Sequence, residues 1–168
     1  MPPVVVLIGS PGAGKSSVGK RVAGTLKVPF VDSDRVIEDE TGMTIADFFV
    51  DRGEGAFRDL EADAVARCLA VDDAVLALGG GAVLRPETQE RLAGHRVVWL
   101  KVSLHDAAQR VGLNQARPLL LGNVRGTLAT LLERREPIYS AVATDVVETS
   151  GRSVKQVADE VVKAVRRD

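Results

Sequence analysis

The 168-residue sequence is poor in the residues that build metal centres and disulfide frameworks. It holds one cysteine, Cys68, and two histidines, His95 and His105, which cannot supply the ligands of a tetrahedral zinc site or form a cystine pair. Aromatic residues make up only 4% of the chain. A chain of this length nevertheless buries about two thirds of the surface that its unfolded form exposes. The sequence therefore predicts one ordinary globular domain, whose single thiol suits a reducing compartment.

Long apolar runs and an excess of either charge are also missing. The 22 Lys and Arg residues nearly balance 23 Asp and Glu residues, whereas nucleic-acid binders neutralise phosphates with many basic side chains. The apolar run at residues 4–8 is far shorter than the ~20 residues that span a bilayer, and no signal-peptide pattern opens the chain. We therefore expect a cytoplasmic protein that binds neither nucleic acid nor membrane. With no long apolar edge evident, we expect a monomer.

Short apolar runs alternate with longer helical patterns along the whole chain. The run at residues 4–8 is apolar at every position, as is typical of a strand buried on both faces of a parallel sheet. Similar runs occur at residues 30–31, 74–78, 97–102 and 145–147. This alternation predicts a three-layer α/β fold in which helices flank a five-stranded parallel sheet.

Apolar periodicity and capping residues predict several helices between these strands. We expect helices over residues 35–41, 45–50 and 54–70, because apolar side chains recur there at helical spacing and the ends carry capping residues. Ser153 and Gln156 form a capping-box pattern at the start of the last helix. The residues between these helices and the strands then fall at the sheet edges, where ligands can bind.

The most specific motif directly follows the first strand. Residues 9–16, GSPGAGKS, satisfy GxxxxGK[ST] between a strand and a helix. In this motif, backbone N–H groups cradle a phosphate, Lys15 reaches the β- and γ-phosphates and Ser16 coordinates Mg²⁺. A plain glycine turn is the alternative, but it would leave Lys15 unexplained. We expect a nucleoside triphosphate as ligand, and the absence of an NKxD element favours a small kinase over a switch GTPase.

Carboxylates and glycines follow the second and third predicted strands. Asp32, Ser33 and Asp34 end the second run, and residues 79–81 are three consecutive glycines. The carboxyl ends of parallel strands share the edge at which ligands of this architecture bind. One aspartate could hold Mg²⁺ through water, and the other could accept the proton of an attacking hydroxyl. The alternative is a helix N-cap, which is the better interpretation of Ser33. Three glycines favour close contact between backbone and ligand over a simple turn.

Three arginines are candidates for anion binding. Arg58 and Glu61 lie three residues apart beside Phe57, so an acid could hold a cation toward an aromatic-walled pocket, although such a pair alone is more often solvated. Arg135 shares its helical face with leucines and therefore points inward, where it needs an anion. Arg117 lies in a stretch without clear period, which favours a lid that closes over phosphates. Surface placement remains the alternative for Arg117 and Arg135.

Together these segments resemble the shikimate kinase family. The matching segments are GSPGAGKSS from Gly9, DSD from Asp32, FR from Phe57, LGGGAV from Leu78, RPLL from Arg117 and REPIY from Arg135. The resemblance covers nearly the whole chain. It implies a nucleoside-monophosphate-kinase-like fold over residues 1–168, with an acceptor-binding region near residues 33–61 and a lid near residues 112–124. It also implies phosphorylation of the 3-hydroxyl of shikimate by MgATP, on the route to chorismate and aromatic amino acids.

The resemblance assigns roles to individual residues. The catalytic residues would be Lys15, Asp34 and Arg117. The ATP phosphates would be bound by Gly12, Ala13, Gly14, Lys15, Ser16, Ser17 and Arg117, and the adenine would be flanked by Arg110 and Arg152. The metal would be held by Ser16 and Asp32. Shikimate would be bound by Asp34, Phe49, Phe57, Arg58, Glu61, Gly79, Gly80, Gly81 and Arg135.

Two rival functions stay open on the sequence alone. A sister kinase of the same fold could act on gluconate or a nucleotide, although the inward arginines and the DSD segment argue against it. A nucleotide-binding regulator could have lost catalysis, although Lys15, Asp34 and Arg117 are all present.

Overall fold

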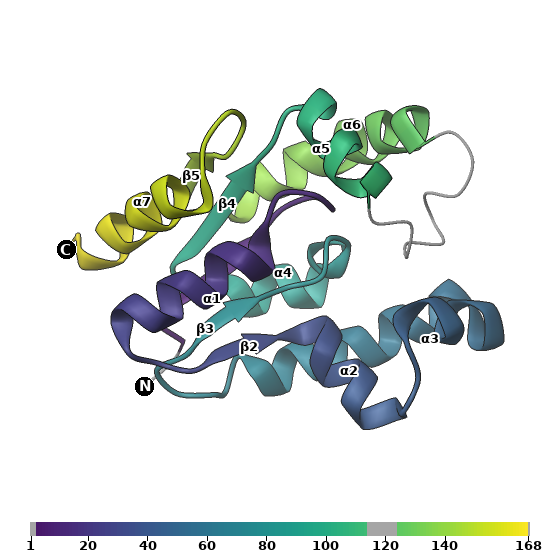
Figure 1. Ribbon diagram of the computed structural model, residues 1–168. Coiled ribbons are helices and arrows are strands. Elements are labelled where there is room, and N and C mark those ends of the chain that lie inside the picture. Colours follow the sequence, from purple (N-terminus) through teal and green to yellow (C-terminus); the bar gives the residue numbers. More distant parts are fainter. Residues whose placement is uncertain (1–2, 114–123, 168) are drawn as a thin grey trace.

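Five parallel strands form the centre of the computed structural model, which describes residues 3–113 and 124–167 (Figure 1). The strands are β1 (Val5–Ile8), β2 (Phe30–Asp32), β3 (Val75–Ala77), β4 (Val97–Lys101) and β5 (Asp145–Glu148). Their order is β2-β3-β1-β4-β5, and every neighbouring pair is parallel. The predicted five-stranded parallel sheet is confirmed. This order places β1, and the phosphate-binding loop that follows it, in the middle of the sheet.

Helices cover both faces of the sheet (Figure 1). They are α1 (Lys15–Leu26), α2 (Ser33–Thr41), α3 (Ile45–Cys68), α4 (Pro86–Leu92), α5 (Leu104–Leu113), α6 (Val124–Val142) and α7 (Val154–Arg166), and a short 3₁₀ turn, η1 (Ala82–Leu84), follows β3. Val5 and Leu7 of β1 face one core, shared with α1 and α7. Val6 and Ile8 face the other, shared with α3 and α4. The first apolar run is therefore buried on both faces, as predicted.

The turn from β2 into α2 differs from the sequence-based expectation. The helix predicted from residue 35 begins at Ser33, and its N-cap is Asp32, whose Oδ1 accepts the Asp34 N–H at 3.0 Å. Ser33 is therefore not the cap. Its buried hydroxyl instead accepts the Gly79 N–H at 3.1 Å. An aspartate is as good an N-cap as a serine. The N-cap is therefore Asp32, one residue before Ser33, and Asp34 lies in the first helical turn.

Helix α3 contains a break where the sequence predicted two helices. Gly53 has φ 81° and ψ 171°, a conformation that is essentially restricted to glycine. The segment before the break starts at its N-cap Thr44, whose hydroxyl accepts the Asp47 N–H at 3.0 Å. The segment after it ends at Cys68, two residues before the predicted end. The break turns the chain so that Phe48 and Phe57 pack edge to face.

The remaining expectations concern the end of the chain and the lid. The Ser153 and Gln156 capping box is present at the start of α7. Of the lid predicted near residues 112–124, residues 114–123 lie outside the described residues. Within residues 3–113 and 124–167, no helix is long and apolar enough to cross a membrane.

Candidate active site

The loop between β1 and α1 presents backbone N–H groups at the carboxyl edge of the sheet. Gly14, the N-cap of α1, has φ 89° and provides no side-chain cap, and no acidic residue lies in the first turn. Helices α2, α3 and α7, by contrast, begin with a side-chain oxygen that accepts a backbone N–H. Lys15 Nζ donates to the carbonyls of Gly9 at 2.7 Å and Ser10 at 3.1 Å, which folds its ammonium over the loop. Such a helix start with a cation above it is suited to a phosphate.

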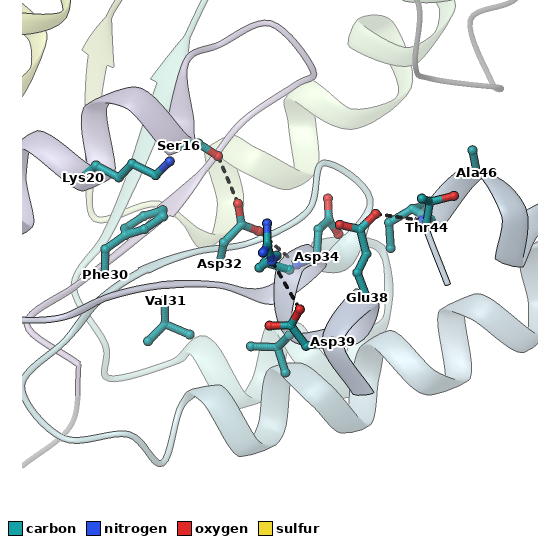
Figure 2. Close-up of a pocket in the computed structure, with 13 residues that line it drawn as sticks. Ser16, Lys20, Phe30, Val31, Asp32, Asp34, Glu38, Asp39, Thr44 and Ala46 are labelled. Carbon is teal, nitrogen blue, oxygen red and sulfur yellow. Dashed lines mark hydrogen bonds and ion pairs between the residues drawn. The ribbon is translucent and has the colours of Figure 1, made fainter. Parts of the chain in front are cut away.

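Ser16 and Asp32 meet beside this loop. The Ser16 hydroxyl donates to Asp32 Oδ2 at 3.0 Å, as Figure 2 shows. Hydroxyl and carboxylate oxygens are the hard donors that Mg²⁺ prefers, and Mg²⁺ in nucleotide sites completes its shell with phosphates and water. Among the described residues, no group of three or more His, Cys, Asp or Glu side chains could hold a metal. This pair therefore fits a magnesium ion that binds together with a triphosphate.

A groove of about 850 Å³ opens next to the Ser16 and Asp32 pair. Figure 2 shows its walls, which come from α1, β2, α2 and the start of α3. Asp32 and Asp34 both line it, and their carboxylates extend to the same side of the β2–α2 turn. The groove therefore joins the position suited to the metal with the aspartate predicted to receive the acceptor proton.

The three glycines after β3, residues 79–81, form a turn on which the predicted acceptor residues converge; we call it the glycine turn. A Cβ atom on Gly79 would lie 2.6 Å from Asp34 Oδ1 and 2.9 Å from Glu61 Oε2. A Cβ atom on Gly81 would lie 2.5 Å from both terminal nitrogens of Arg58. Any side chain at these positions would displace the charged groups. Close contact of this backbone with a ligand stays a prediction, and the groups that approach it in the structure are the protein's own ionic side chains.

Gly80, in the middle of this turn, connects the nucleotide loop with α6. A Cβ atom on Gly80 would lie 3.2 Å from Arg135 Nη1 on one side and 3.2 Å from Pro11 Cδ of the phosphate-binding loop on the other. Arg135 is only 5% exposed, as its place on the leucine face of the helix predicted. The glycine turn thus brings a buried cation within reach of the phosphate-binding loop.

Arg58 and Glu61 form a buried ion pair rather than a solvated one. Arg58 Nη1 donates to Glu61 Oε1 at 2.7 Å, and their side chains are 13% and 3% exposed. Burial raises the pKa of Glu61 above its ordinary value, Arg58 opposes that shift, and the nearby Asp34 charge adds to it. Among the described residues, the buried Nε of Arg58 has no acceptor. A buried guanidinium with a donor to spare is suited to an anionic ligand.

Aromatic rings surround this ion pair. Phe49 and Phe57 have ring centroids 4.9 Å apart, and the Arg58 guanidinium lies 5.4 Å from the centroid of the Phe57 ring. Phe57 is buried and Phe49 half-buried. The predicted aromatic wall therefore lies directly against the predicted carboxylate-binding arginine.

The two arginines predicted near the adenine have different surroundings. Arg110, on α5, donates to the Gly12 carbonyl at 2.8 Å and to the Thr149 carbonyl at 3.5 Å. It therefore bridges the phosphate-binding loop and the loop after β5. Arg152 pairs with Glu160 at 2.9 Å, within its own loop and helix. Arg117, the other predicted phosphate-binding arginine, lies outside the described residues.

Comparison with known proteins gives the fold and the site a family. The shikimate kinase family model matches residues 11–166. A shikimate kinase of Thermobifida fusca is 52% identical over 161 residues, which cover 96% of this chain and 94% of that one. Another, of Salinispora tropica, is 54% identical over 161 residues, with 96% of each chain covered. The chain belongs to the shikimate kinase family.

A solved structure leads to the same family. The chain matches a shikimate kinase of Acinetobacter baumannii in complex with shikimate with a TM-score of 0.94 and 34% sequence identity, over 98% of this chain and 93% of that one. The predicted family, α/β fold class and kinase activity with ATP as phosphate donor are confirmed. The roles of individual residues in this shikimate kinase stay predictions.

Two hydroxyls make contacts with the glycine turn that the sequence did not predict. Tyr139 donates to the Gly80 carbonyl at 2.6 Å, and Ser33 accepts the Gly79 N–H. Only Tyr139 left a signal in the sequence. It follows Arg135 by four residues, which places the two side chains on one face of a helix. The contact of Ser33 depends on the pairing of β2 with β3, and it left no signal in the sequence.

Proposed function

We propose that this shikimate kinase transfers the γ-phosphoryl group of ATP to the 3-hydroxyl of shikimate, with Mg²⁺ held by Ser16 and Asp32. The observation that carries this proposal is the charge distribution along the glycine turn, which has Arg58 and Arg135 on one part and Asp34 on another. Shikimate is a small carboxylate that bears ring hydroxyls. It therefore needs cations at one end and a carboxylate at the other.

The acceptor is held through its own carboxylate. Arg58, held by Glu61, and Arg135 grip that carboxylate from two helices, with the backbone of the glycine turn between them. Bidentate guanidinium contacts fix orientation as well as position. Phe49 and Phe57 wall the pocket and exclude water from it. The ring hydroxyls then lie toward Asp34.

Transfer follows from the positions of Asp34 and Lys15. A hydroxyl oxygen of the acceptor forms a bond to the γ-phosphorus as the bond from that phosphorus to the bridging oxygen breaks, and ADP leaves. Asp34 accepts the hydroxyl proton. Lys15 and the N–H groups of residues 12–17 hold the phosphates and stabilise the transferred charge. Bound Mg²⁺ would neutralise part of the phosphate charge. By family resemblance, Arg117 adds a cation over the phosphates.

The adenine site is proposed on the positions of Arg110 and Arg152. Arg110 supports it by its bonds to Gly12 and to the Thr149 carbonyl, which place its guanidinium between the phosphate-binding loop and the loop after β5. Arg152 lies in that second loop.

We further propose that the enzyme works as a monomer in the cytoplasm and does not bind nucleic acid. The near-zero net charge supports the last point. Among the side chains that the structure describes, the exposed large apolar ones are scattered over separate elements, which supports a monomer. They are Val50, Val71, Leu84, Val146 and Val154. Sedimentation at increasing protein concentration tests this, and a concentration-dependent dimer would contradict it.

The proposed reaction is tested by ADP release in a coupled assay with MgATP. The acceptors are shikimate, quinate, gluconate and nucleoside monophosphates. A shikimate-dependent rate well above the hydrolysis background is expected, with rate lost on metal chelation and regained with added Mg²⁺. The Asp34→Ala variant should lose transfer and still bind ATP. A faster rate with gluconate or a nucleotide would require a different acceptor site, and ATP binding without any turnover would favour a regulator.

A further inference from the structure

The backbone of the glycine turn has four of its six hydrogen-bonding groups engaged. Ser33 takes the N–H of Gly79. The carbonyls of Gly79 and Gly81 accept N–H groups of η1, and the Tyr139 hydroxyl donates to the carbonyl of Gly80 at 2.6 Å. Within residues 3–113 and 124–167, the N–H groups of Gly80 and Gly81 have no acceptor. Buried backbone donors are normally satisfied, so these two are the groups that a ligand can take.

Tyr139 contacts this turn from the protein core. Its side chain is 1% exposed, and its ring packs against Trp99 with centroids 5.7 Å apart. Burial raises the pKa of the phenol, and the positive charge of Arg135, one helical turn earlier, opposes that shift. The hydroxyl therefore stays protonated at neutral pH. It donates to the Gly80 carbonyl, and the guanidinium of Arg135, proposed to bind the acceptor, also lies beside Gly80.

The hydrogen bond from Tyr139 to the Gly80 carbonyl also fixes the direction of the Gly81 N–H, because of the geometry of the peptide bond. The carbonyl of Gly80 and the N–H of Gly81 belong to the same peptide unit, and in a trans peptide they point in opposite directions. The described residues contain no cis peptide bond. A hydrogen bond that holds this carbonyl toward the buried Tyr139 hydroxyl therefore directs the Gly81 N–H to the opposite side of the peptide, away from Tyr139. Glycine on both sides would otherwise let the peptide rotate.

We propose that Tyr139 is a positioning residue of the acceptor site: its hydroxyl fixes the peptide between Gly80 and Gly81, so that one backbone N–H and the Arg135 guanidinium bind the acceptor carboxylate together. This inference rests on the proposed carboxylate binding and adds the residue that orients it. Tyr139 itself touches neither acceptor nor nucleotide in this scheme.

The test compares Tyr139→Phe with the wild type on two acceptors. One is shikimate, and the other is its analogue with a hydroxymethyl group in place of the carboxylate. The variant should raise KM for shikimate by about tenfold, the cost of a lost hydrogen bond that leaves a buried acceptor unpaired. KM for ATP should be unchanged. Discrimination between the two acceptors should fall, because the charged carboxylate accepts the aimed N–H more strongly than the oxygen of a hydroxymethyl group does.

Controls separate positioning from damage to the fold. Val161→Ala removes core volume on the other face of the sheet and should lower the melting temperature without changing discrimination. An equal rise in KM for both acceptors in Tyr139→Phe would overturn the proposal, as would unchanged discrimination. Replacement of Tyr139 by 4-aminophenylalanine keeps a donor and should keep discrimination; its loss there would also overturn the proposal. A wild type that does not phosphorylate shikimate would refute the proposed function instead.

Discussion

The proposed nucleotide and acceptor sides of this active site are built in different ways. The nucleotide side is one continuous segment, residues 9–17, which offers backbone N–H groups and a lysine at the uncapped start of α1. The acceptor side is assembled from side chains of α2, α3 and α6 that meet only at the glycine turn. A single segment between a strand and a helix can bind phosphate by itself. Selection of one acceptor, in contrast, depends on how distant elements pack. Substitutions should therefore separate the two sides.

Lys15→Met should have the largest effect. Loss of the ammonium removes the cation that stabilises charge on the transferred group, and we expect kcat to fall by about 10²- to 10³-fold. Shikimate affinity, measured by calorimetry without nucleotide, should be unchanged, because the acceptor side does not use this residue. Lys163→Met, at an exposed position of α7, is the matched control. Loss of shikimate affinity in Lys15→Met would show that the two sides are not separable.

Arg135→Ala should give the opposite pattern. The variant loses a buried guanidinium that faces the glycine turn, and KM for shikimate should rise by about a hundredfold, as expected for one partner of a buried charge pair. ATP affinity should stay the same. The neighbouring Arg134 is exposed on the same helix, so Arg134→Ala tests for general effects of charge. Equal losses in the two variants would remove Arg135 from the site.

The difference between the two sides also explains what the sequence could predict. The phosphate-binding loop is a local pattern, and the strand before it is apolar throughout, so both followed from the residues themselves. The five strands and the break at Gly53 were predictable for the same reason. The N-cap of α2 was not, because Asp32 and Ser33 are nearly equivalent as caps and only the pairing with Gly79 separates their roles.

On the proposed acceptor side, the sequence predicted residues that the structure brings together, but not how they meet. The inward direction of Arg135 followed from helical periodicity, whereas the burial of Arg58 with Glu61 did not, since such pairs are usually solvated. The three glycines predicted close contact with a ligand. In the structure, the closest groups include Asp34 and Glu61, because strand order brings α2 and α3 to the same edge as β3.

Gly79→Ala tests the acceptor side by the addition of a single methyl group. The added Cβ atom would lie 2.6 Å from Asp34 Oδ1, so the carboxylate must move. We expect kcat to fall by about tenfold, since misplaced catalytic groups lose rate steeply, with ATP binding unchanged. Gly24→Ala, on α1, meets nothing within 4 Å and should stabilise the protein by about 0.5–1 kcal/mol without changing the rate. A fully active Gly79→Ala would mean that Asp34 tolerates displacement.

The smallest effect is expected from the pH dependence of stability at Glu61. Burial raises the pKa of this carboxyl above the ordinary value of 4.5, against the attraction of Arg58. A carboxyl with a higher pKa in the folded state binds protons more tightly there, so its contribution to stability is complete below 4.5 and is lost as pH rises through the folded pKa. Glu61→Gln does not titrate. The wild-type free energy of unfolding, minus that of the variant, should therefore decrease as pH rises.

Denaturant unfolding of both proteins over that pH range measures this difference. Glu90→Gln, which replaces an exposed carboxyl on α4, is the matched control. An increase with pH for Glu61→Gln would mean that attraction by Arg58 outweighs burial. A decrease means that the acceptor side holds a buried carboxylate at a cost in stability, which the nucleotide side, made of backbone and one lysine, does not carry. Side-chain recognition of a small acid would then be what makes this edge of the fold less stable.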